Sequence, residues 1–151
     1  MKEADFAFMK EALKEAELAA AIGEVPVGAV LVKDGKILSR RHNLRETGKM
    51  ATAHAELLCI EDGCRVLGGW RLSGCSLYVT LEPCPMCAGA IVNARLDRVV
   101  FGAKDFRAGA FGSLLDLSAL PLGWKPETEG GIMKEEALGL LRAFFEKKRT
   151  E

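Results

Sequence analysis

The segment TLEPCPMCAGAIVN, from Thr80 to Asn93, contains a sharp change of pattern. Alternating apolar residues lead into it, whereas an alanine-rich apolar run follows its two cysteines. Pro83 and Pro85 stand near the start of that run, where the first N–H groups of a helix have no intrahelical partner. The segment therefore predicts a strand that leads directly into a helix N-terminus.

Cys84 and Cys87 are the metal-binding residue types of this segment. On a helix, residues i and i+3 share a face, so both sulfur atoms can point at one ion. A helix N-terminus also favours negative charge, which lowers the pKa of a thiol toward the thiolate form that metals bind. This spacing predicts two ligands of a zinc site.

The tripeptide His54-Ala55-Glu56 supplies what the cysteine pair lacks. The chain has 2 histidines, and His54 opens its own apolar helical run. Structural zinc sites fill four positions with protein side chains, whereas catalytic sites keep one position for water. One imidazole and two thiolates leave such an open position, and Glu56 can accept and return a proton beside it. The alternative for Glu56 is a surface ion-pair partner.

His-x-Glu followed by Pro-Cys-x-x-Cys is the signature of zinc nucleobase deaminases. Both motifs resemble the cytidine/deoxycytidylate deaminase superfamily, and more narrowly the bacterial tRNA-specific adenosine deaminases. The narrower resemblance covers nearly the whole chain and draws on Glu24 to Ala29, Trp70 to Leu72, Leu77 to Thr80, Phe101 to Asp105, Gly109 to Ser113 and Phe144-Phe145. It implies a zinc-dependent hydrolase that converts the wobble adenosine of a tRNA anticodon to inosine and releases ammonia.

The resemblance also implies roles for individual residues. One Zn²⁺ per chain is expected on His54, Cys84 and Cys87, with Glu56 as the catalytic acid and base and with no organic cofactor. Substrate contacts are expected from Asn43, Ala55, Pro83, Lys104, Asp105, Arg107 and Phe145. Considered without the resemblance, Asn43 could simply turn its loop, and the two basic residues could be ordinary solubilising charges.

Two other functions fit the same motifs. A deaminase of a free base, nucleoside or nucleotide, such as cytosine, guanine or dCMP, would use the same zinc chemistry. A structural-zinc RNA-binding protein without turnover would need a fourth protein ligand, for which Cys75 and His42 are the candidates. The chain departs from the family pattern at Met50-Ala51 and at Gly123-Trp124. Trp124 could stack on a base or be buried.

The length predicts one domain, residues 1–151, which the resemblance makes a zinc-dependent deaminase domain, and the cysteine usage fits a reducing cytoplasm. The formal net charge is +0, so RNA binding must come from a local basic face rather than from the field of the whole molecule. An odd number of cysteines, 5, argues against a disulfide framework. No run approaches the ~20 apolar residues of a membrane span, and the charged N-terminus is unlike a signal peptide. The resemblance implies a homodimer with the tRNA anticodon loop as its partner.

Hydrophobic periodicity predicts helices at residues 2–22, 54–67, 84–93 and 135–148, and strands at 27–33, 36–41, 76–81, 98–102 and 128–132. This order predicts an α/β fold with three layers, α-β-α, around a mixed five-stranded sheet. Both metal-bearing helix starts follow strands or loops, so the site is expected at one edge of the sheet. Trp70 is expected in the core, and Gly63 is expected to weaken its helix by about 1 kcal/mol.

Overall fold

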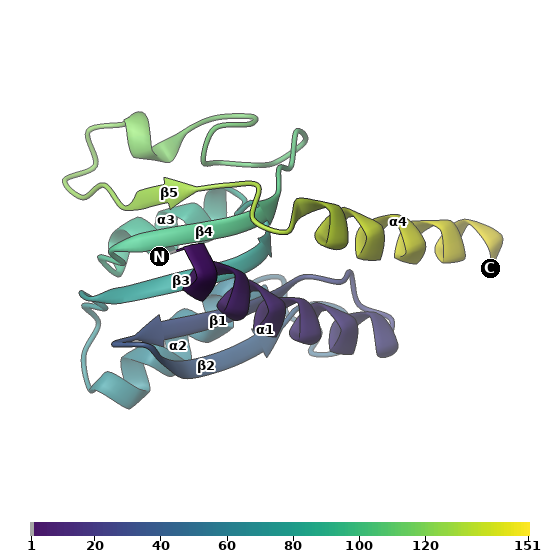
Figure 1. Cartoon of the computed structure of the whole chain (residues 1–151), viewed down its shortest axis with the longest axis horizontal. Coiled ribbons are helices and arrows are strands. Elements are labelled where there is room, and N and C mark those ends of the chain that lie inside the picture. The colour runs from purple at the N-terminus through teal and green to yellow at the C-terminus, as the bar shows by residue number, and fades with distance from the viewer. Residues whose placement is uncertain (1) are drawn as a thin grey trace.

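The computed structural model describes residues 2–151 as three layers, with one sheet between two layers of helices (Figure 1). In chain order the elements are α1 (Lys2–Ala21), β1 (Gly28–Lys33), β2 (Lys36–His42), α2 (Ala55–Leu67), β3 (Cys75–Leu81), α3 (Pro85–Asn93), β4 (Arg98–Ala103), the 3₁₀ turn η1 (Leu117–Ala119), β5 (Glu127–Glu129) and α4 (Lys134–Thr150). Within these residues, none of the helices has the length and apolar character needed to cross a membrane.

The five strands form a mixed sheet in the order β2-β1-β3-β4-β5. β1 runs antiparallel to both β2 and β3, whereas β3, β4 and β5 run parallel to one another. Because β2 and β3 both run opposite to β1, they share one direction with β4. The C-terminal ends of β2, β3 and β4 therefore meet the start of β1 at a single edge, which confirms the predicted mixed sheet.

Alternating side chains of the strands bury two separate apolar faces. Leu31 and Leu77, which are neighbours across β1 and β3, pack with buried residues of α2 and α3. The next pair, Val30 and Tyr78, points the other way and packs with residues of α1 and α4. A strand period of two thus produces both helix layers (Figure 1) and confirms the predicted three-layer α/β fold.

The predicted element boundaries hold to within a few residues except at the last strand. β5 covers Glu127–Glu129 rather than 128–132, and it pairs with the first half of β4. The three-residue length leaves little periodic signal in the sequence for a strand boundary. Its parallel pairing with β4, rather than its composition, defines this strand.

The expectation for Trp70 is wrong. Trp70 follows the end of α2 and is 50% exposed, whereas its near neighbour Leu72 is fully buried. The guanidinium of Arg71 lies 4.4 Å from the centre of the Trp70 ring, a cation–π contact at the surface. Apolar character alone does not distinguish an indole in the core from one that stacks on an arginine outside it.

Gly63 has a packing role that helix propensity does not reveal. It is buried in α2, and a Cβ atom at this position would lie 2.4 Å from Leu31 Cδ2 on β1. The helix continues past it to Leu67, where Gly68 ends it in the left-handed conformation. The absence of a side chain at Gly63 lets α2 pack close to the sheet.

The starts of α2 and α3 place the motif residues at the sheet edge described above. His54 and Cys84 are the N-cap residues of the two helices, both with extended backbone, and neither side chain makes a capping hydrogen bond. Pro85 occupies the first turn of α3, as the sequence predicts. The side chains of His54 and Cys84 point toward one another instead of capping their helices.

Candidate active site

Three side chains at these helix starts can hold one metal ion. His54 Nδ1 lies 3.7 Å from Cys84 Sγ and 3.5 Å from Cys87 Sγ, and the three donor atoms all lie within 4.8 Å of one another. Zinc bonds of about 2.05 Å to nitrogen and 2.3 Å to sulfur, at a tetrahedral angle, separate those two donors by about 3.6 Å. The observed separations therefore fit a single zinc ion.

The protonation of the three groups is linked. Hydrogen bonding to Cys87, and then to His54, lowers the pKa of the Cys84 thiol to about 4. The hydrogen bond with Cys84 and burial raise the pKa of Cys87, and the hydrogen bond with Cys84 also raises the pKa of His54. The group thus holds a thiolate before a second thiol is ionised, and metal binding releases the remaining protons.

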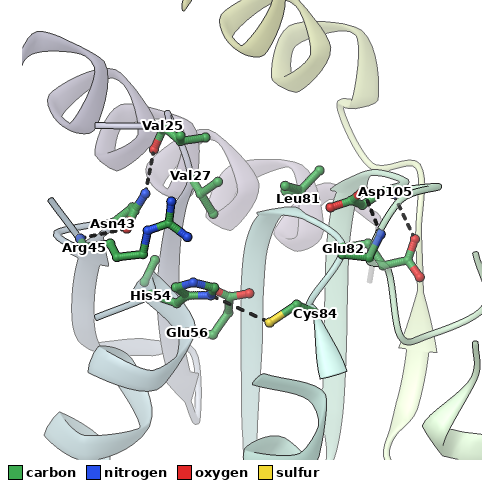
Figure 2. A pocket seen from close by; sticks show the side chains of 12 residues that line it. Val25, Val27, Asn43, Arg45, His54, Glu56, Leu81, Glu82, Cys84 and Asp105 are labelled. Carbon is green, nitrogen blue, oxygen red and sulfur yellow. Dashed lines mark hydrogen bonds between the residues drawn. The ribbon is translucent and has the colours of Figure 1, made fainter. Parts of the chain in front are cut away.

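Glu56 lies one residue into α2 with its carboxyl group beside this cluster (Figure 2). It is 4% exposed, and burial raises its pKa to about 7. A surface ion-pair role is therefore excluded. A carboxyl group with a pKa near neutral is suited to accept and return a proton at physiological pH.

A cavity of about 190 Å³ opens over the cluster. Apolar walls come from Val25 and Val27 before β1 and from Leu81 at the end of β3 (Figure 2). The remaining lining residues are mostly polar: Asn43, Arg45, His54, Ala55, Glu56, Glu82, Cys84, Asp105 and Ala108. Apolar walls with a few convergent polar groups are typical of a site that binds a flat organic ring.

The loop between β2 and α2 presents Asn43 to this cavity. Asn43 Oδ1 accepts a hydrogen bond from the Arg45 N–H at 3.0 Å, and its amide donates to the Val25 carbonyl. The buried Glu24 accepts hydrogen bonds from the N–H groups of Glu46 and Thr47, which fixes the next turn. Asn43 therefore both turns the loop and lines the cavity, so its two interpretations are compatible.

A second groove lies beside the cavity and contains the predicted basic and aromatic residues. Lys104, Arg107 and Phe145 line it together with Phe106 and Leu141. Phe145 is 45% exposed and meets Phe144 edge-on at 5.2 Å between ring centres. The structure thus brings the segment after β4 together with α4, although the two are far apart in sequence.

The other predicted substrate residues lie in two environments. Asp105 lines both the cavity and the groove, and the buried Ala55 lines the cavity. Pro83 is buried and is not among the lining residues of the cavity, and its carbonyl accepts a hydrogen bond from the Ala110 N–H. Its contact with substrate stays a prediction.

Neither candidate for a fourth zinc ligand lies at the cluster. Among residues 2–151, the group able to hold a metal comprises His54, Cys84 and Cys87. His42 Nδ1 lies 2.8 Å from a Glu15 carboxylate oxygen, and Cys75 begins β3, the strand whose other end leads to Cys84. The geometry thus favours a catalytic metal site over a structural one.

Trp124 lies far from the cavity. Its indole N–H donates a 2.8 Å hydrogen bond to the Leu96 carbonyl, just before β4 begins, whereas the cavity lies at the end of β4. The indole is half-buried. The structure therefore favours partial burial of Trp124 over stacking on a base in the cavity.

The two motifs alone do not predict several residues that line the cavity: Val25, Val27, Arg45, Leu81 and Glu82. The segment Glu24 to Ala29 carried part of the family resemblance, and Glu82 directly precedes Pro83 in the zinc motif. Their positions in the cavity depend on β1 and β3 lying side by side, which local patterns do not specify.

The fold and the site together define a zinc-dependent hydrolytic deaminase. The chain belongs to the cytidine and deoxycytidylate deaminase family, since residues 2–103 match its zinc-binding region. The family match and the His-Cys-Cys group assign one zinc ion to the chain.

Similar proteins fall within the same superfamily. The tRNA-specific adenosine deaminase of Bacillus subtilis (strain 168) is 52% identical over 148 residues, which are 97% of this chain and 92% of that protein. A solved structure from a study of A-to-I editing by tRNA:A34 deaminases at the wobble position covers 89% of this chain and 99% of its own, with 43% identity and a TM-score of 0.87. A guanine deaminase structure from Bacillus subtilis, also 43% identical, covers 65% of this chain and 63% of its own, with a TM-score of 0.62.

Replacing a ligand should remove zinc. We expect Cys87→Ala to weaken zinc affinity by more than about 100-fold, because loss of groups that merely support a ligand already costs 10–100-fold. Metal content measured by atomic emission after incubation with a chelator tests this. Cys75→Ala, a buried cysteine at the other end of β3, is the matched control and should keep one equivalent. Loss of zinc from the control alone would contradict the assignment.

Proposed function

We propose that this chain deaminates the wobble adenosine of a tRNA anticodon to inosine and releases ammonia. The carrying observation is similarity over almost the whole length to tRNA-specific adenosine deaminases, including the parts outside the zinc motifs. The groove made by the segment after β4 and α4 belongs to those outer parts. The guanine deaminase structure with 43% identity, by contrast, reaches that identity over about two thirds of the chain.

His54, Cys84 and Cys87 are the residues that would hold the zinc ion. When bound, zinc supplies Lewis-acid activation of water, whose pKa falls from 15.7 to about 7 in such sites. Glu56 lies beside the ligands, where its carboxylate can take a proton from the attacking water and deliver it to the ring nitrogen. The same carboxyl group then assists protonation of the departing amine.

The cavity holds the base while this proton moves. Val25, Val27 and Leu81 offer apolar surfaces for a flat ring. One N–H of the Asn43 side-chain amide donates to the Val25 carbonyl. In this proposal the other N–H donates a hydrogen bond to the nucleoside. Ala55 and Asp105 complete the contacts around the ring. A base stacked inside a helix cannot enter, so the substrate must present an unstacked loop nucleotide.

RNA contacts outside the cavity are assigned to the adjoining groove. Lys104 and Arg107 place positive charge next to the exposed ring of Phe145. This combination suits a single-stranded nucleic acid, because phosphates bind the cations and bases stack on aromatic faces. The last turn of α4, the helix that supplies Phe145, adds the basic residues Lys147, Lys148 and Arg149.

The test of this function is an inosine assay on an anticodon stem-loop that carries adenosine at the wobble position. We expect deamination of the stem-loop and none of free adenosine, guanine, cytosine or dCMP at equal concentration. Guanine or cytosine turnover without stem-loop turnover would replace the proposal by the free-base alternative. A bound zinc ion with no turnover of any of these would favour the RNA-binding alternative.

Loss of the proposed acid–base group should stop the reaction without loss of metal. We expect Glu56→Ala to reduce turnover by at least about 10²- to 10⁴-fold, the usual contribution of a positioned acid or base, with zinc content unchanged. Single-turnover deamination and metal analysis measure the two effects. Glu61→Ala, which removes an exposed carboxylate from the same helix, is the control and should retain full activity. Normal deamination by the Glu56 variant would rule out the acid–base role.

Loss of a groove cation should weaken RNA binding in a salt-dependent way. We expect Arg107→Ala to flatten the plot of log affinity against log salt by about 0.7, the value for one phosphate contact on a single strand. Fluorescence anisotropy with a labelled stem-loop measures the slope. Lys125→Ala removes an exposed cation beside Trp124, at the other end of β4, and should leave the slope unchanged. Equal slopes for all three proteins would show that Arg107 contacts no phosphate.

We further infer that residues 1–151 work as one domain, as a homodimer in the cytoplasm. The family resemblance supports a homodimer, as do exposed apolar side chains around the end of α2, with Val66 59% and Trp70 50% exposed. Sedimentation equilibrium should give twice the chain mass, and a monomer at micromolar concentration would exclude this state. Cell fractionation tests the location.

A further inference from the structure

Glu82 is a buried carboxylate that the proposed chemistry does not use. It stands between the end of β3 and Pro83, two residues before the first zinc-ligand cysteine, and it is 2% exposed. An ionised side chain in such a place is expensive unless its oxygens are hydrogen-bonded. The identity of its partners therefore shows what it does.

All the hydrogen bonds that Glu82 accepts come from one segment, residues 105–113, which follows β4. Oε1 accepts from the Asp105 N–H at 3.1 Å and from the Ser113 hydroxyl. Oε2 accepts from the Phe111 N–H at 3.0 Å and from the Ser113 N–H at 3.1 Å. One carboxylate thus fixes both ends of this segment, and Figure 2 shows its contact with Asp105 at the edge of the cavity.

Gly109 in the middle of the segment makes this arrangement possible. A Cβ atom there would lie 2.4 Å from Glu82 Cδ and 2.5 Å from Glu82 Oε1. The segment therefore wraps closely around the carboxylate, and any side chain at Gly109 would displace one from the other. The Ala110 N–H adds a bond to the Pro83 carbonyl, next to Glu82.

The same segment forms substrate-facing surface on both sides. Asp105 and Ala108 line the cavity, and Arg107 lines the groove beside it. Asp105 Oδ1 in turn accepts hydrogen bonds from the N–H groups of Arg107 and Ala108. The hydrogen bonds of Glu82 therefore fix the position of these residues relative to the zinc ligands.

We propose that Glu82 is a positioning residue that holds the RNA-contacting segment 105–113 in register with the zinc-ligand turn. This inference rests on the proposed function for what the segment contacts. Without the carboxylate, four hydrogen-bond donors of the segment lose their acceptor, and the segment must be ordered again each time RNA binds. Ordering the segment on binding lowers the affinity for RNA. The metal ligands and Glu56 keep their positions, because the starts of α2 and α3 hold them independently of the segment.

Glu82→Gln is the sharpest change, because it preserves shape. A glutamine keeps one acceptor oxygen but turns an NH₂ group toward two of the donors. We expect the KM for the stem-loop to rise at least tenfold, kcat to stay within threefold, and zinc content to stay at one equivalent. Glu15→Gln, which removes a buried carboxylate that pairs with His42, controls for the general cost of such a loss and should leave KM unchanged.

Gly109→Ala tests the same contact without altering a charge and should raise KM in the same way. Limited trypsin digestion supplies a readout that does not need turnover, because Lys104 and Arg107 are exposed cleavage sites at the segment. Cleavage there should be at least tenfold faster in both variants than in the wild type and Glu15→Gln.

Unchanged KM and unchanged cleavage in the folded, zinc-loaded Glu82→Gln protein would overturn the proposal. A fall in kcat or zinc content at constant KM would do so as well, since it would place Glu82 in support of the metal site. Failure of the wild type to deaminate the stem-loop would refute the proposed function instead. The cleavage comparison would still decide whether Glu82 holds the segment.

Discussion

The site depends on the direction of three strands. β2 and β3 both run antiparallel to β1, and β4 runs parallel to β3, so three C-terminal ends reach the same sheet edge. The chain leaves β2 by the loop that leads to α2 and leaves β3 directly into α3, which brings His54 to Cys84. The start of β1 lies at that edge too, which places Val25 and Val27 over the ligands. If β2 or β3 ran in the opposite direction, the His54 imidazole and the two thiols would lie at opposite edges of the sheet.

Buried carboxylates around this edge have distinct tasks. Glu24 accepts N–H groups of the loop after β2, and Glu82 accepts those of the segment after β4. Each oxygen used in this way is satisfied by fixed donors, which rigidifies the walls of the cavity. Glu56 interacts mainly with the cluster itself, and its burial keeps its pKa near neutrality. The two structural carboxylates thus hold loops in place around the one that can exchange a proton.

Local sequence patterns specify much of this arrangement and fail at identifiable points. The zinc ligands follow from two short motifs that are recognisable together although His54 and Cys84 are 30 residues apart, and the helix layers follow from strand alternation. The sequence pattern predicts the position of Trp70 wrongly, since it does not distinguish an exposed indole stacked on Arg71 from a buried one. Glu82 gave no signal of its own: its partners lie 23 to 31 residues away and become neighbours when β3 pairs with β4. Contacts of that kind are a property of the fold rather than of a motif.

The proposed chemistry and the proposed RNA contacts lie in different parts of the molecule. The ligands and Glu56 sit on helix starts anchored to the sheet, below a cavity whose apolar walls are Val25, Val27 and Leu81. With a formal net charge of +0, long-range attraction does not select RNA, and the proposed function therefore assigns recognition to short-range contacts at the groove of Lys104, Arg107 and Phe145. That groove is built from a loop segment and a helix that extends beyond the sheet edge (Figure 1). If these contacts select the substrate as proposed, selectivity depends on how firmly the segment after β4 is tied to the zinc-ligand turn, and Glu82 makes that connection through hydrogen bonds to Asp105, Phe111 and Ser113.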